Sequence, residues 1–261
     1  MTSQNQDMLN ACTSGDITAL RRLFEAMDIR KGSEPVYIST PNEPPPINDL
    51  LEAAITNGNP GIVSLLLETY SGIQFFGGVI TALLNHPDLA ILEALYNYDN
   101  RIVNFEWDDQ VTTFVTEACK QPPEKIAPLL HFLVEHDADL WTGGLPSQFA
   151  VHAALCGNQA LDVIEAMIKK GGLVSRQAAE QAVLRERADV LEFFIRCGVE
   201  GERDDVQFLR TVAKETGNTN VMKLVDIWTR RWKDNTSRAL FGRGLFGRGL
   251  RFGSIWRHIF G

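Results

Sequence analysis

The stretch N-D-L-L-E-A-A-I-T-N-G-N-P-G-I-V-S-L-L-L-E-T-Y, residues 48–70, contains the clearest structural pattern in the chain. Leu51 and Ala54 are three residues apart and therefore share one face of a helix. Gly58 is typical of the residue that ends a helix, and Pro60 suits the first turn of the next one, where its missing N–H costs nothing. The apolar residues that follow form a broad stripe suited to burial. The pattern predicts a short helix, a tight turn and a second helix that runs back antiparallel to the first.

The same pattern recurs along the chain. Seven alanines lie 28 to 43 residues apart, and each stands four residues before a polar position that suits a turn. These are Ala11, Ala54, Ala82, Ala118, Ala153, Ala182 and Ala213. A period between 20 and 50 residues indicates a stacked-repeat architecture. We therefore expect helix-turn-helix units at residues 5–27, 47–70, 76–98, 108–137, 147–171, 175–198 and 205–232.

The best unit resembles the ankyrin repeat. Gly58-Asn59, Ile62-Val63 and Leu65-Leu66-Leu67 match the middle of that repeat, and residues 217–224 match it again. Asp137 stands where the family has a glycine, and Asp tolerates the left-handed conformation better than most residues. The resemblance implies an all-α, ankyrin-like solenoid of about seven degenerate repeats. Its concave face would bind a partner protein.

The resemblance covers residues 5–232, but the T-P-L-H sequence that normally caps the first helix of an ankyrin repeat is absent. A tetratricopeptide array, whose period is also about 34 residues, is the main alternative. Its W-x-x-L-G-x-x-Y signature is not found in the chain either. A HEAT-like array is a more distant alternative.

Charge divides the chain into a body and a tail. Residues 1–234 contain 20 Lys/Arg and 33 Asp/Glu, whereas residues 235–261 contain five Arg and no acid. The acidic body should repel nucleic acid, and the basic tail should attract it. We expect 1–234 to form the repeat domain, with a proline-rich insertion at 33–46 that excludes helix. We expect disorder over 235–250, where glycines penalise helix, and a short helix at 254–260.

The tail has several possible roles. It could dock on the acidic body, touch nucleic acid or an import receptor, contact an anionic membrane, or cap the last repeat. Its basic and aromatic residues are Arg243, Arg248, Arg251, Trp256 and Arg257.

Motifs for chemistry are weak. His131 and His136 are five residues apart, so they do not share a helical face as the two histidines of a zinc-binding H-E-x-x-H do. The widely spaced cysteines fit small buried packing positions, and no catalytic or nucleotide-binding motif is present. We expect no enzyme activity, cofactor or metal. No signal peptide or apolar run of membrane-spanning length is visible, so we expect a cytoplasmic or nuclear monomer with reduced thiols.

Large aromatic side chains near the predicted repeat tips are the candidates for partner binding, because binding energy concentrates in such residues. With their acidic neighbours they are Phe75, Phe76, Glu106, Trp107, Asp108 and Trp141. The aromatics could instead fold inward and seal gaps between irregular repeats. If any are exposed, we expect them to be Trp107 and Trp141. The acids beside Trp107 favour a basic partner. The sequence predicts a protein–protein adaptor or scaffold. The alternatives are a nuclear transcription co-regulator whose tail aids import or nucleic-acid contact, and a small enzyme or ligand-binding protein.

Overall fold

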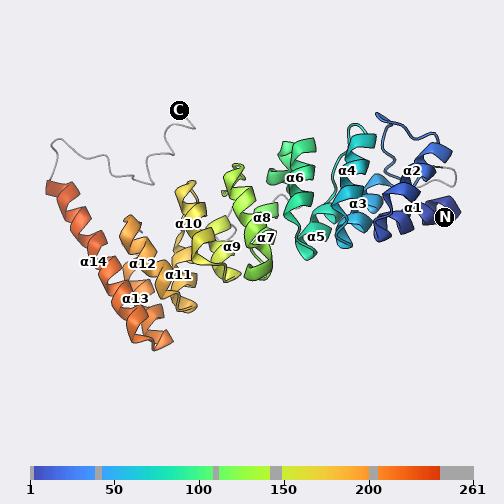
Figure 1. The fold of residues 1–261 in the computed structure, drawn as a ribbon. Helices are drawn as coiled ribbons and strands as arrows, with labels where there is room; N and C mark the ends of the chain where they lie inside the picture. Colours follow the sequence, from blue (N-terminus) through green and yellow to red (C-terminus); the bar gives the residue numbers. More distant parts are fainter. Residues whose placement is uncertain (1–2, 39–42, 108–111, 142–148, 200–204, 242–261) are drawn as a thin grey trace.

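The computed structural model describes residues 3–38, 43–107, 112–141, 149–199 and 205–241. Within these residues the chain is all helical, with fourteen α-helices, one short 3₁₀ helix and no strand. The expected all-α class is therefore confirmed. The helices lie in two layers that follow the chain from one end of an elongated molecule to the other (Figure 1).

Odd-numbered helices make up the first layer, in which each helix contacts the next odd-numbered one. They are α1 (Ser3–Ser14), α3 (Ile47–Thr56), α5 (Gly77–Asn85), α7 (Phe114–Ala118), α9 (Ala150–Cys156), α11 (Arg176–Leu184) and α13 (Asp205–Thr216). Even-numbered helices make up the second layer in the same way. They are α2 (Ile17–Ala26), α4 (Pro60–Thr69), α6 (Leu89–Tyr98), α8 (Pro123–Glu135), α10 (Leu161–Lys169), α12 (Ala188–Cys197) and α14 (Thr219–Phe241).

The recurring alanines mark the turns that join the two layers. The carbonyls of Ala11, Ala54 and Ala182 each accept a hydrogen bond, about 3.0 Å long, from the N–H five residues later. This bond requires a left-handed residue in the turn, and Gly58 supplies it with a φ of +64°. Asp137 also has a positive φ, of +58°, as its place in the pattern predicts. The alanine side chains are buried because two helices approach closely there.

The apolar core runs between the layers along the whole length of the described chain. At the C-terminal end Trp228 of α14 is buried, packs against Phe194 and donates from its indole Nε1 to the carbonyl of Val199 at 2.6 Å. Cys12 and Cys119 are buried as expected. Cys197 is exposed, so the buried position expected for it is wrong, because it lies at the solvated end of α12.

The proline-rich insertion forms no helix in its described parts and folds back on the segment after α4. Ser33 forms an isolated parallel β-bridge with Tyr70. The N–H of Ile47 donates to the carbonyl of Val36 at 2.8 Å. The insertion therefore packs on the protein as an extended loop.

The boundary expected after residue 234 is not the end of a helix. Helix α14 continues to Phe241, so the disorder expected from residue 235 is wrong for residues 235–241. These residues contain no glycine or proline, and the helix ends where the glycine-rich repeat begins. The expected helix at 254–260 and the basic residues from Arg243 onward lie outside the described residues. No described helix combines the length and the apolar character needed to cross a membrane.

Candidate partner-binding surface

The N-terminus of α5 is a point of close approach in the first layer. A Cβ atom at Gly77 would lie 2.7 Å from the indole Nε1 of Trp107, and one at Gly78 would overlap the carboxylate of Glu52. Gly77 and Gly78 thus allow Trp107 and Glu52, from separate segments, to lie on one turn of α5. Through these two side chains, α3 and the segment before α7 meet on the surface at the start of α5.

Phe76, the residue before α5, is the exposed aromatic of this surface, with 47% of its area accessible. The ring of Tyr37 lies 5.5 Å from it, centroid to centroid. The buried side chain of Asn48 accepts from the N–H of Phe76 and donates to the carbonyl of Gln74, both at 3.2 Å. Phe76 is therefore held in place by its backbone while its side chain faces solvent.

Trp107 is half-buried and is held by contacts with residues just before α7. Its N–H donates to the carbonyl of Thr112 at 3.0 Å, and Glu106 forms an isolated antiparallel bridge with Thr113. Its ring stands perpendicular to that of Phe105, with centroids 5.0 Å apart. The Phe105 ring and these backbone contacts thus fix the indole against the start of α5.

A groove with a volume of about 530 Å³ continues from Trp107 along α5 to α7. It is lined by Thr81, Leu84, Asn85, Trp107, Thr112, Glu117 and Gln121. Helix α7 has only five residues, whereas α5 has nine, so α7 leaves the C-terminal half of α5 partly uncovered.

The carboxylates around the groove are not equivalent. Burial, together with repulsion from Asp49, raises the pKa of Glu52 above its ordinary value. Glu117 pairs with Lys120, and Glu106 is exposed. We call Glu52, Phe76, Trp107 and Glu117 the aromatic–acidic surface.

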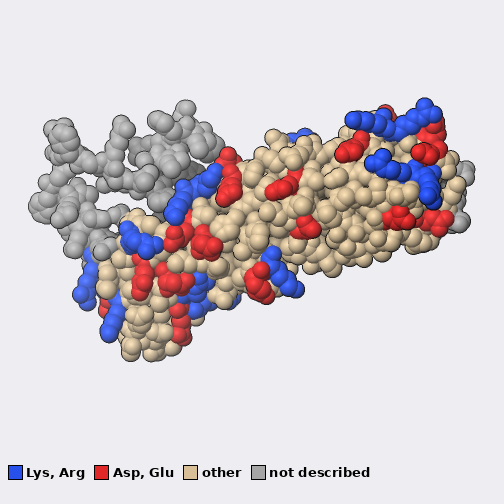
Figure 2. Space-filling view, in the orientation of Figure 1, with Lys and Arg blue, Asp and Glu red and all other residues tan. Residues whose placement is uncertain are grey.

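Charge is distributed unevenly around this surface. Residues 43–141 contain three Lys/Arg and fifteen Asp/Glu, a net charge of −12, whereas residues 142–234 contain thirteen of each. In the view of Figure 2 the middle of the molecule is mostly uncharged or acidic, and most Lys and Arg lie toward the two ends. The negative charge of the body is thus concentrated in the part that carries the aromatic–acidic surface.

The aromatic residues expected to bind a partner differ in how accessible they are to solvent. Phe75 is half-buried and packs edge-on against Tyr98, so it supports the core. Trp141 is half-buried and lies 6.1 Å from Phe149. The expectation that Trp107 and Trp141 are the exposed aromatics is wrong, since Phe76 is the more accessible side chain.

Asp108 lies outside the described residues. Glu52 is not among the residues predicted from the sequence, because its place in the surface depends on a contact with α5. The adjacent glycines at 77 and 78 were the available signal.

Histidine and cysteine side chains are the remaining candidates for chemistry. The described residues contain no group of three His, Cys, Asp or Glu that could hold a metal ion. His131 instead contacts Asp162 at 3.1 Å. Burial raises the pKa of the Cys12 thiol to about 12 and raises that of Cys156 as well, although His152 lies 3.5 Å from it. These two thiols are protonated at neutral pH and are poor nucleophiles.

No protein-family model matches the chain, and no curated protein matches it either.

Proposed function

We propose that the chain is an ankyrin-like helical-repeat solenoid of about seven degenerate units that acts as a non-catalytic adaptor or scaffold. In this proposal it binds a basic partner protein on the first-layer face formed by α3, α5 and α7. The repeating alanine turns and the two-layer order of the helices support the architecture. Stacked repeats of this kind present extended surfaces for binding.

The observation that carries the functional proposal is an exposed, backbone-anchored Phe76 next to Gly77, against which Trp107 lies, in an acidic part of the chain. Fixed aromatic side chains supply binding energy at low entropic cost, and tryptophan is among the commonest hot spots. Surrounding carboxylates favour and orient a basic partner. A partner peptide with Lys or Arg near apolar residues fits this chemistry.

The test is capture of partners by the immobilised full-length protein and by Phe76→Ala/Trp107→Ala, with quantitative mass spectrometry. Loss of a hot-spot aromatic costs about 2 kcal/mol, so retention of the specific partner should fall at least about tenfold. The matched control is Leu184→Ala/Ile227→Ala, which removes side chains exposed to 47% and 45% elsewhere. A partner lost equally from both variants, or from neither, would refute the proposed surface. Thermal unfolding of each variant verifies that it is folded.

A further inference from the structure

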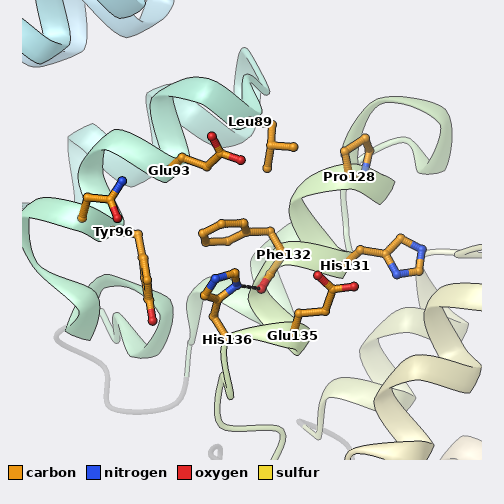
Figure 3. A pocket seen from close by; sticks show the side chains of 9 residues that line it. Leu89, Glu93, Tyr96, Pro128, His131, Phe132, Glu135 and His136 are labelled. Carbon is orange, nitrogen blue, oxygen red and sulfur yellow. Dashed lines mark hydrogen bonds between the residues drawn. The ribbon is translucent and has the colours of Figure 1, made fainter.

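A second cleft lies on the opposite layer, between α6 and α8, with a volume of about 550 Å³ (Figure 3). It is separate from the aromatic–acidic surface, because both of its walls belong to second-layer helices. Its α6 wall includes Leu89, Glu93 and Tyr96, and its α8 wall includes Phe132, Glu135 and His136.

Three rings of this cleft form a fixed aromatic group. Phe132 and His136 are stacked with centroids 3.8 Å apart, and Tyr96 stands nearly perpendicular to both, at 5.4 and 4.6 Å. The His136 Nδ1 lies 2.8 Å from the carbonyl of Phe132, as the dashed line in Figure 3 marks. A carbonyl can only accept, so Nδ1 carries a proton and the orientation of the imidazole is set. The rings are thus ordered before any ligand binds.

Two carboxylates complete the cleft. Glu93 and Glu135 come from opposite walls, both are exposed, and no Lys or Arg lines the cleft. Lys170, beside the end of α8, is engaged elsewhere: it bonds to Asp137 at 2.7 Å and to the Glu135 carbonyl at 3.2 Å. Aromatic faces and carboxylates together suit a guanidinium group, which stacks on rings and pairs with carboxylates at its edge.

The chain itself contains a segment of matching chemistry. Residues 242–261 include four Arg and no acid, interspersed with Leu, Phe, Ile and Trp. They follow α14, which belongs to the same layer as the cleft, and α12 and α10 are the neighbours between α14 and α8. Helices pack about 8–10 Å apart, so three steps along the layer reach α8 and a fourth reaches α6, roughly 30–40 Å in all. Sixteen extended residues beyond Phe241 span about 53 Å, which brings Arg257 within reach of the cleft.

The surface of α10 and α12, between α14 and the cleft, should attract the basic segment less strongly than the cleft does. Glu165 of α10 is already paired with Lys169 and Arg196, both at 3.1 Å. Residues 142–234 have no net charge, whereas residues 43–141 carry −12. Net charge along the layer therefore favours the cleft between α6 and α8 over the surface of α10 and α12.

We propose that the cleft between α6 and α8 binds an arginine of the chain's own C-terminal segment, residues 242–261. The guanidinium lies against Tyr96 and His136 and pairs with Glu93 or Glu135. The segment then crosses the outer faces of α10 and α12, and so links the C-terminal end of the molecule to its acidic middle.

Carbodiimide coupling in the full-length protein tests this directly, because it joins a carboxylate to a lysine amine only when the two are in contact. The variant Arg251→Lys/Arg257→Lys places lysines in a segment that has none. We expect the cross-links, mapped by mass spectrometry, to join these positions mainly to Glu93 and Glu135. Adding Glu93→Gln/Glu135→Gln should remove them, whereas the control Glu192→Gln on α12 should not.

Other cross-link patterns would overturn the proposal. Cross-links mainly to Glu165 and Glu192 would show that the segment samples only its nearest surroundings. Cross-links to Glu52 or Glu117 would place it on the first layer. With a mixture of ¹⁵N-labelled and unlabelled protein, cross-links between the two isotopic forms would assign it to a second copy.

A second measurement keeps the native arginines. Trypsin should cleave after Arg251 and Arg257 several-fold more slowly in the native protein than in Glu93→Gln/Glu135→Gln. Equal cleavage rates would contradict docking of the segment in the cleft.

Discussion

Residues 43–141 and residues 142–234 are built from the same two layers of paired helices, yet they differ in the balance of acidic and basic side chains. The first region has a net charge of −12, and the second has none. In the second region Arg176, Arg187 and Arg196 pair with Asp205, Asp189 and Glu165.

In the first region Asp99 pairs with Arg101 and Glu117 pairs with Lys120, whereas Asp137 pairs with Lys170 of the second region. The comparison shows that the apolar core and the turns set the fold. Excess negative charge and accessible aromatic rings distinguish the region that we propose binds other groups.

The largest expected effect is on the apolar core, and it tests how firmly the neutral region is packed. Trp228→Ala removes a buried ring and its bond to the carbonyl of Val199, so it should lower the free energy of unfolding by about 3–5 kcal/mol. Urea unfolding measures this value. The control Ile227→Ala, at an exposed neighbouring position, should change it little. A loss below 1 kcal/mol for Trp228→Ala would mean that α14 adds little to the stack.

The next effect concerns the junction of the two regions. The buried Gln159 donates from Nε2 to the carbonyls of Cys119 at 2.8 Å and Gln121 at 2.9 Å. Gln159→Leu leaves these carbonyls without that donor and should cost about 1–3 kcal/mol. We expect the exposed Gln207→Ala to be close to neutral in the same urea titration. If Gln159→Leu were neutral, the junction would be held by apolar contacts alone.

The two regions should also respond oppositely to removal of a carboxylate. Burial raises the pKa of Glu52, so near that pKa the folded state binds more protons than the unfolded state. The free energy of unfolding therefore falls as pH rises from the ordinary pKa of a glutamate through the raised pKa of Glu52. Glu52→Gln should therefore stabilise the protein slightly at pH 7 and have no charge effect well below about pH 4.

Asp189 provides the matched case. Hydrogen bonding to Arg187 lowers the pKa of Asp189, so its contribution to stability is present above its ordinary pKa and is lost as pH falls through the lowered value. Asp189→Asn should slightly destabilise the protein at pH 7. Thermal unfolding between pH 3 and pH 8 compares the two variants. Shifts of the same sign at pH 7 would contradict the distinction between the regions.

The smallest effect comes from self-repulsion at exposed acids. Glu68→Gln on α4 should raise the free energy of unfolding by at most about 0.5 kcal/mol at low salt, and added salt should reduce this gain. Glu192→Gln on α12, an exposed acid in the neutral region, should show no such gain. Equal salt-dependent gains for the two variants would indicate that the uneven charge has no effect on stability.

Much of the helical pattern could be predicted from the sequence, because alanines, glycines and apolar stripes report local geometry. Gly58, Pro60 and Asp137 occupy the turn and helix positions that their residue types predict. The surface could not be predicted as well, because accessibility depends on neighbours distant in sequence. Trp107 is half-buried because Gly77 accepts its indole, and Phe76 is exposed because Asn48 holds its backbone.

The central claim is that the acidic region binds the partner and the neutral region supports it. Hydrogen–deuterium exchange of the full-length protein, with and without the captured partner, tests this most directly. The account predicts slower exchange in α3, α5 and residues 105–107 on binding, with α11 to α14 unchanged. Slower exchange confined to α11 to α14 would contradict it.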